Sequence, residues 1–203
     1  MKRTVQVIGS GRAESTPDVV KLSVTAAATR DSMSEASGAA NAATSRVRGA
    51  LAAAGIAGAD AVTQAVRFEP EWRGDGQPQR YTARQSIGVM SRDVAGAGDL
   101  VTALVEAGGN EVTIDHLEFA VSDLGPLDTA AREAAYADAR ARAEQYASLA
   151  GASLGAVLTV VEGGGGAMPV LRAAKMEADA GGMGLESGAV SVETFVTVTW
   201  EFA

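Results

Sequence analysis

The stretch just before the C-terminus constrains the fold most, because apolar and polar side chains alternate along it. Segment 189–202 reads AVSVETFVTVTWEF. Successive side chains of a β-strand point to opposite faces, so the sequence predicts a strand whose core face carries Val190, Val192, Val196, Val198, Trp200 and Phe202. The opposite face, with Ser191, Glu193, Thr197, Thr199 and Glu201, is expected to meet water. Such a strand is typical of an antiparallel sheet that is covered on one side.

Shorter patterns of the same kind place further strands and helices along the chain. Strands are predicted at 4–8, 19–25, 61–72, 81–90, 112–121 and 156–161, and helices at 32–54, 93–108 and 126–150. The first two strands are expected to form one hairpin, and 61–72 with 81–90 a second. The nearly continuous apolar run at 156–161 predicts burial on both faces. This mixture indicates an α+β fold, with helices packed on one face of antiparallel sheets.

The order of these elements predicts two intertwined α/β subdomains within one domain of 203 residues. Segment 60–122 is expected to be a small plait inserted between 1–59 and 123–203. A loop rich in Gly and Met covers 163–188 and contains Met168, Met176 and Met183. Loops of this length are either disordered or functional, and methionine adapts to irregular surfaces. An ordered contact arm and plain disorder are both open for this loop.

Composition and charge exclude several classes of function. A formal net charge of −8 argues against binding nucleic acid, which needs a basic surface. The chain has no cysteine, so thiol nucleophiles and cysteine-based metal sites are excluded. No apolar run is long enough for a membrane span, and the first strand begins too early to leave room for a secretory leader. We therefore expect a soluble cytoplasmic protein, or a periplasmic or exported one if a leader has been removed.

Three patterns that carry chemistry in other proteins have simpler explanations here. Gly9-Ser10-Gly11 begins like a phosphate-binding loop but lacks the third glycine and a Gly-Lys-Ser/Thr ending. Glu69 and Glu71 flank Pro70 on a predicted strand, where charge guards an edge against strand pairing. His116 is the only histidine, and no set of ligands or nucleophile elbow accompanies it. We therefore expect no enzyme activity, no catalytic or metal-binding residues and no cofactor.

Small residues form one row along the longest predicted helix. Ala131, Ala135, Ala139 and Ala143 repeat every four residues. Such a row lets another backbone approach closely, and that backbone belongs either to the chain's own sheet or to a neighbouring subunit.

Several short motifs follow one another in a characteristic order along nearly the whole chain. They are VIGSG at 7–11, Pro17-Asp18, Gly55-Ile56, FEPEW at 68–72 with Tyr81, AREAA at 131–135, ARARAE at 139–144, Ala147, GASLG at 151–155, SGAVSV at 187–192 and VTVT at 196–199. In this order and spacing the chain resembles the SIMPL-domain family of bacterial proteins.

The resemblance implies a role and an assembly but no chemistry. Proteins of this family are linked to envelope integrity and oxidative-stress defence, many are exported, and a relative forms a large ring-like, channel-shaped homo-oligomer. No established set of catalytic residues can be transferred from the family. This sequence departs from most relatives because it shows no leader.

Two hypotheses on function follow from the sequence. The first is a non-enzymatic, self-assembling protein of the stress-defence or envelope type, whose partner is a second copy of itself. Its contacts are expected at Met168, Met176, Met183, Phe195 and Trp200. The alternative is a small-molecule-binding module with a pocket near Trp72, Tyr81 and His116, because aromatic residues are scarce elsewhere.

Overall fold

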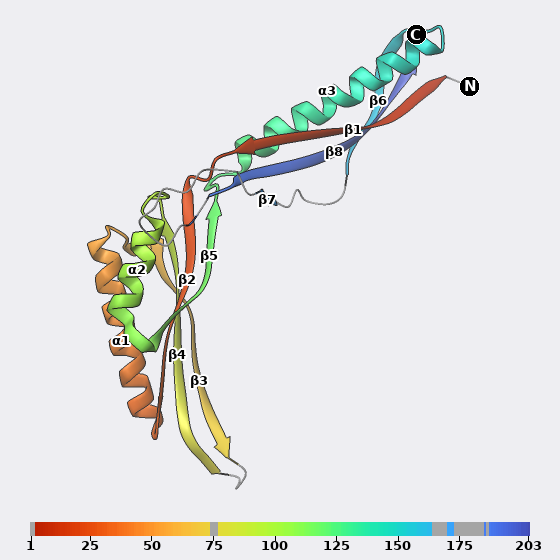
Figure 1. Cartoon of the computed structure of the whole chain (residues 1–203). Helices are drawn as coiled ribbons and strands as arrows, with labels where there is room; N and C mark the ends of the chain where they lie inside the picture. Colours follow the sequence, from red (N-terminus) through yellow and green to blue (C-terminus); the bar gives the residue numbers. More distant parts are fainter. Residues whose placement is uncertain (1–2, 74–76, 164–169, 173–184, 186) are drawn as a thin grey trace. The chain divides into compact units, whose positions relative to one another are not determined.

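The computed structural model describes residues 3–73, 77–163, 170–172, 185 and 187–203. The chain divides into two compact units. Unit 1 consists of 1–16, 121–175 and 188–203, and unit 2 of 17–120 and 176–187. Figure 1 labels the elements of both units, and each unit has an antiparallel sheet with helices on one face, as expected for an α+β fold.

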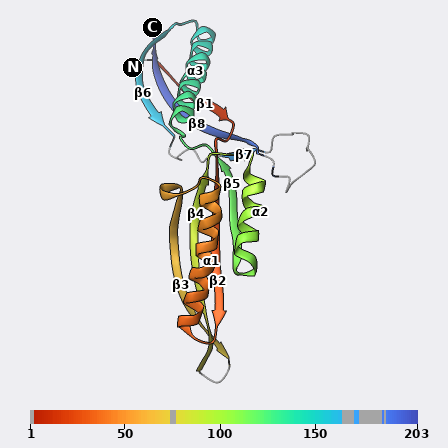
Figure 2. The same ribbon diagram turned by 90° about the vertical axis from the view of Figure 1, so that its left-hand side faces the viewer.

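Unit 2 contains a four-stranded sheet with two helices packed on it. The strands are β2 (Val19–Arg30), β3 (Ala61–Arg73), β4 (Gln77–Ser91) and β5 (Val112–Ala120), in the order β3-β4-β2-β5. Figure 2 shows α1 (Met33–Ala53) and α2 (Ala97–Gly108) side by side on one face. Short 3-10 turns lie at Gly58–Asp60 and Gly109–Glu111. The core between the layers includes Val20, Leu22, Val24, Val47, Leu51, Ile87 and Leu104.

Local signals explain where α1 begins and ends. Ser32 is the N-cap, and its hydroxyl accepts a hydrogen bond from the Glu35 amide at 3.2 Å, as the capping spacing predicts. Gly55 follows the last turn with φ +76°, a conformation that favours glycine. In contrast, Asp93 does not begin α2. Its carboxylate accepts a hydrogen bond from the Gly96 amide at 2.9 Å, and the helix starts one residue later at Ala97.

Unit 1 contains a sheet covered by a single long helix. Its strands are β1 (Thr4–Ser15), β8 (Ala189–Phe202) and β6 (Leu154–Glu162), in the order β1-β8-β6. The short strand β7 (Val170–Arg172) pairs with the first residues of β8. Helix α3 (Gly125–Leu149) lies along β1 and β8 (Figure 1).

The close approach of α3 to the sheet depends on small residues on both sides. Ala131, Ala135 and Ala139 are completely buried in the row of alanines that faces the sheet. Below them lie Gly9 and Gly11 of β1, and a Cβ atom at either glycine would clash with the backbone of α3. The alanine row therefore packs on the chain's own sheet, and the two glycines leave room for a helix backbone rather than for a phosphate.

The terminal strand β8 has the burial pattern that its alternation predicts. Val192, Val198 and Trp200 are buried under α3, whereas Glu193 is exposed. Two positions differ from the prediction. Ser191 is buried, and Phe202 is only half-buried, with the Arg3 guanidinium 5.5 Å from its ring centre.

The first predicted hairpin is wrong, whereas the second is confirmed. β1 pairs with β8 in unit 1, and β2 pairs with β4 and β5 in unit 2. The Gly- and Pro-containing segment between β1 and β2 therefore carries the chain from one unit into the other instead of reversing it. β3 and β4 do form an antiparallel hairpin.

The boundaries predicted for the subdomains also differ from the structure. Segment 60–122 does not form a sheet by itself, because β2 lies between β4 and β5. Unit 2 therefore begins near residue 17 rather than 60, and α1 belongs to it. Within the predicted 163–188 loop, β7 pairs with β8 and Leu185 packs against the core of unit 2. Most of that loop lies outside the described residues.

The glycine contacts yield a stability test. We expect Gly11→Ala to lower the free energy of unfolding by about 1–3 kcal/mol, because the added methyl group meets the backbone of α3. The matched control is Gly38→Ala in α1, where nothing lies within 4 Å of the new methyl group. This change should raise stability by up to about 1 kcal/mol through helix propensity. Urea denaturation of the two variants and the parent measures both effects, and equal effects would contradict the packing argument.

Candidate interaction surface

The outermost strands of each sheet have backbone groups that do not pair with any other described strand. Such edges promote association unless something protects them. In unit 2 the edge strand β3 is protected by charge. It carries Arg67, Glu69 and Glu71 around Pro70, which cannot donate a hydrogen bond. Glu69 lies 3.7 Å from Arg84, and Glu71 accepts a hydrogen bond from the Thr82 hydroxyl at 2.9 Å. Both glutamates lie on an edge strand, where charge is expected to oppose pairing with another strand.

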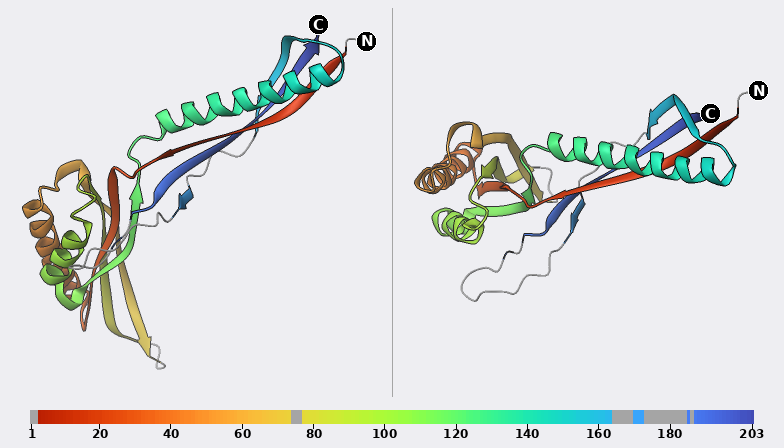
Figure 3. Two further views of the ribbon diagram at one scale, coloured as in Figure 1. Left: turned by 45° about the horizontal axis from the view of Figure 1, so that its top comes forward. Right: turned by 90° about the horizontal axis from the view of Figure 1, so that it is seen from above.

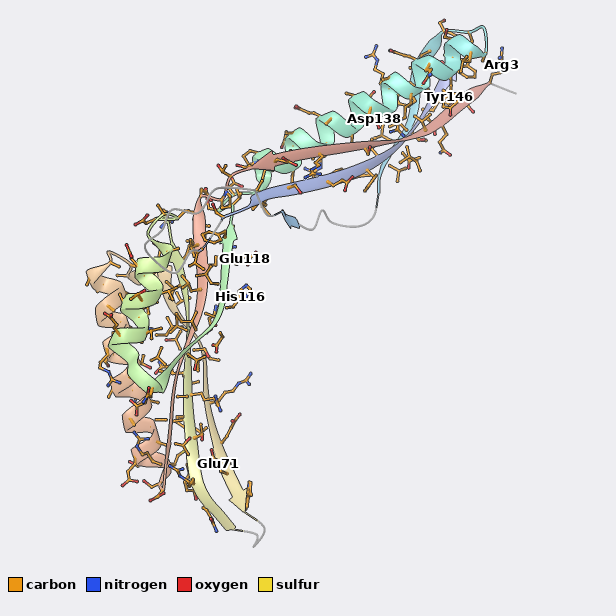
Figure 4. All side chains as sticks on the ribbon, in the orientation of Figure 1. Arg3, Glu71, His116, Glu118, Asp138 and Tyr146 are labelled. Atoms are coloured by element: carbon orange, nitrogen blue, oxygen red, sulfur yellow. The ribbon has the colours of Figure 1, made fainter. Side chains whose placement is uncertain are left out.

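The opposite edge of unit 2, strand β5, is also charged. His116 and Glu118 lie 3.7 Å apart on the face of the sheet away from the helices (Figure 4). Asp115 sits where the pairing register shifts, and its carboxylate accepts a hydrogen bond from the Thr25 hydroxyl at 2.5 Å. These residues make β5 a polar, irregular edge.

The outer edge of β1 in unit 1 is capped by side chains of α3. The Ser10 amide donates to Asp138 Oδ2 at 2.8 Å, and Arg142 donates to the Ile8 carbonyl at 3.1 Å. Arg142 also pairs with Asp138 at 2.9 Å. The hydrogen bond from the Ser10 amide is the main cause that lowers the pKa of Asp138 below its ordinary value of 3.8, and Arg142 adds to it.

Strand β6, which together with β7 forms the other edge of the unit 1 sheet, has no comparable protection among the described residues. From Leu154 to Val161 it carries no charge and no proline. Val157, Leu158, Val160 and Val161 are 42–58% exposed, so the prediction that this run is buried on both faces is wrong for the single chain. The apolar run lies at an edge, and both of its faces remain accessible.

The helix that covers β1 and β8 barely reaches β6, which leaves these side chains uncovered. Figure 3, right panel, shows β6 to one side of α3. Arg132 donates to Glu162 at the end of β6 at 2.9 Å, and the Tyr136 ring lies 6.2 Å from that of Trp200. Cross-strand pairing puts Val157 beside Trp200 and Val160 beside Val198, on the same face as α3. This flank of α3 and the two β6 valines therefore form an exposed apolar strip.

The face of the unit 1 sheet away from α3 adds a second apolar group. Ile8, Thr197 and Val161 lie in one cross-strand row. Phe195, two residues from Thr197 on β8, shares this face. Ile8, Phe195 and Val161 are each about half exposed. Apolar side chains that share one open face are typical of an interaction surface.

The residues predicted as assembly contacts have different surroundings. Phe195 is exposed on the open face, in agreement with a contact role. Trp200 is only 2% exposed and lies in the core under α3, so it is unavailable as a surface contact. The remaining three, Met168, Met176 and Met183, lie outside the described residues.

The residues predicted to line a ligand pocket do not come together. Tyr81 pairs with Arg30, on the helix side of the unit 2 sheet, whereas His116 pairs with Ser23, on the other side. Trp72 lies in β3, which pairs with β4, and Tyr81 of β4 is opposite Pro70, two residues from Trp72. His116 lies on β5 at the other edge of the sheet, so the three residues do not form one site.

A cavity of about 510 Å³ lies elsewhere in unit 2, where the end of α1 meets the start of α2. Its floor is apolar, with Ile56 and Leu100, and it also contains Ser91, Asp93 and Asp99. No sequence pattern pointed to this cavity, because its lining comes from separate elements that are brought together by the sheet.

Other kinds of site have little support among the described residues. In that part of the chain no group of three or more His, Cys, Asp or Glu side chains could hold a metal ion. Glu111 has a lowered pKa because of its hydrogen bonds with Arg30 and Arg46, a surface ion-pair network that joins β2 and α1. No described helix has the length and hydropathy needed to cross a membrane.

The capped β1 edge gives a stability effect that depends on pH. Because the folded-state pKa of Asp138 is lowered, its ionised form stabilises the protein above the unfolded-state value of about 3.8. That stabilisation is lost as the pH falls through the folded-state pKa. We therefore expect Asp138→Asn to be less stable than the parent at neutral pH, with a difference that shrinks in acid. Thermal melts from pH 7 downward measure it, with exposed Gln145→Ala on the same helix as the control, a change that removes no titratable group.

A comparison with known families agrees with the motifs along the chain. The model of SIMPL, a protein of unknown function (DUF541), matches residues 5–200, which include both units. A search of curated proteins finds no matching relative. The match covers every described strand and helix except the first residue of β1 and the end of β8, so the chain belongs to the SIMPL family.

Proposed function

We propose that this protein is a non-enzymatic, self-assembling protein that acts as a homo-oligomer, with β6 as its principal contact. The observation that carries the proposal is the uncharged edge of β6, with four half-exposed apolar side chains on its two faces. An edge of this kind is an aggregation hazard unless a partner covers it. β3 also exposes apolar side chains, but Arg67, Glu69, Pro70 and Glu71 lie among them, whereas the described part of β6 has no charge or proline before Glu162.

The nature of the exposed surface favours a protein partner over a small ligand. Exposed apolar groups lie both in the strip beside α3 and on the open face, so a covering partner must reach two sides of one strand. A second polypeptide strand does this, because it continues the sheet and presents side chains to both faces. A structural role in envelope or stress defence, as the family resemblance implies, is consistent with such an assembly.

A matched pair of valines tests the role of β6. Val160 on β6 and Val66 on β3 are 55% and 54% exposed, and both lie on edge strands. We expect Val160→Lys to reduce the mass of the assembly in solution, because a charge on β6 opposes strand addition. Val66→Lys should leave the mass unchanged, because β3 is already charged.

Light scattering and sedimentation over a wide concentration range measure these masses, and circular dichroism verifies that both variants are folded. A parent protein with the mass of one 20.5 kDa chain at every concentration would refute self-assembly. An equal loss of mass in both variants would argue against a specific role of β6.

The alternative, a small-molecule-binding module, is supported by the cavity between α1 and α2. Its apolar floor and the carboxylates of Asp93 and Asp99 suit a small amine with an apolar body. We expect alkylamines to raise the melting temperature of the protein and Asp99→Asn to reduce that shift. As a control for folding, Asp99→Asn must melt at the same temperature as the parent when no ligand is present. If alkylamines do not raise the melting temperature of the parent, this class of ligand is excluded.

A further inference from the structure

We propose that β6 pairs antiparallel with β6 of a second copy of this chain about a two-fold axis within Leu158–Val161. The sheets of the two copies then become one continuous sheet, in the order β1-β8-β6-β6-β8-β1. This inference rests on the proposed self-assembly and specifies which partner covers the strand and in which direction.

Charge favours a second copy at this edge. The chain has a net charge of −8, so two copies repel each other over most of their surface. β6 has no charge between Leu154 and Val161, and two β6 strands can approach without placing like charges opposite each other. A copy added at β5 would bring the carboxylates of Asp115 and Glu118 of both chains to one edge, and Pro70 lacks the amide that a copy added at β3 would need.

The direction of pairing follows from Glu162, the charged residue at the end of β6. In a parallel, in-register pair the two Glu162 carboxylates would lie beside each other, and like charges directly opposite are destabilising. In the antiparallel pair they lie toward opposite ends of the joined strands. Antiparallel pairing therefore removes the one electrostatic conflict that β6 contains.

The flank of α3 that faces β6 gives Glu162 a partner in the other copy. Arg132 already pairs with Glu162 in its own chain. Arg140 lies eight residues after Arg132 on α3, which places it about 12 Å closer to the Leu154 end of β6. Residues four apart on a helix share one flank, as the buried alanines do, so Arg140 lies on the same flank as Arg132. The antiparallel arrangement carries Glu162 of the second copy toward this end. Arg140 already pairs with Glu144 of its own chain at 2.9 Å, so it meets Glu162 of the second copy by sharing or exchanging that contact.

The same symmetry covers the apolar strip beside α3. A two-fold axis perpendicular to the sheet keeps both copies of α3 on the same face. Tyr136, Val157 and Val160 of each copy then line the two walls of one channel above the paired strands. Burying these side chains from both copies supplies the hydrophobic free energy that strand pairing alone does not provide.

Engineered cysteines can test this pairing because the chain contains none of its own. Single cysteines are placed at Leu158, Thr159, Val160 and Val161, and the control is Val66→Cys on β3. Mild oxidation followed by non-reducing electrophoresis then shows which variants form a dimer of twice 20.5 kDa. In an antiparallel pair, residues on the axis lie opposite their own copies, within the Cα separation of about 4.4–6.8 Å that a disulfide needs.

The expected result is rapid cross-linking at one position, because only the residue on the axis lies opposite its own copy, and several times slower cross-linking at the other positions and at Val66→Cys. Equal cross-linking at all four positions would show parallel pairing and overturn the proposed direction. Cross-linking no faster than the control, in a protein that is still oligomeric, would overturn the β6 contact and leave self-assembly intact. A monomeric parent would overturn self-assembly itself.

Discussion

The fold of unit 1 depends on the close approach of α3 to β1, where two glycines and a row of alanines let the helix backbone almost touch the strand. This contact holds the helix closest to β1, where Gly9 and Gly11 have no Cβ atoms, and valines and Trp200 of β8 pack beside it. A single helix covers little more than two strands. The third strand, β6, therefore lies outside its reach, and the exposure of β6 is a direct consequence of how tightly α3 packs.

The same contact protects one edge of the sheet and leaves the other open. With α3 close to β1, Asp138 and Arg142 reach the outward-facing amide of Ser10 and carbonyl of Ile8. These bonds satisfy backbone groups that would otherwise be available to another chain. On the β6 side α3 contributes Arg132, whose bond goes to the Glu162 carboxylate and not to the backbone. The β1 edge is therefore protected and the β6 edge is not, because the side chains of α3 form hydrogen bonds with backbone groups of β1 but not of β6.

The sequence predicts elements better than it predicts their partners, and the reason is physical. The alternation in 189–202 reports a central strand with one covered face, because burial acts directly on side-chain polarity. β1 pairs with β8, which lies nearly the whole chain away in the sequence. The Gly- and Pro-containing segment after β1 gives no sign of whether it reverses the chain in a hairpin or leads into the other unit. The Asp138–Ser10 contact spans 128 residues and leaves no local signal. An apolar run such as β6 is equally compatible with a buried strand and with an edge that requires a partner.

The symmetry of the proposed pair limits what it can build. A two-fold contact uses the same strand in both copies and closes on itself, so it gives dimers and no more. An assembly larger than a dimer therefore requires a second surface. The open face of unit 1 is suited to this role, because Val161 lies on β6 beside the axis and pairing brings the Ile8, Val161 and Phe195 groups of both copies onto one continuous face. Dimer formation would then create the larger apolar surface on which a second kind of contact depends.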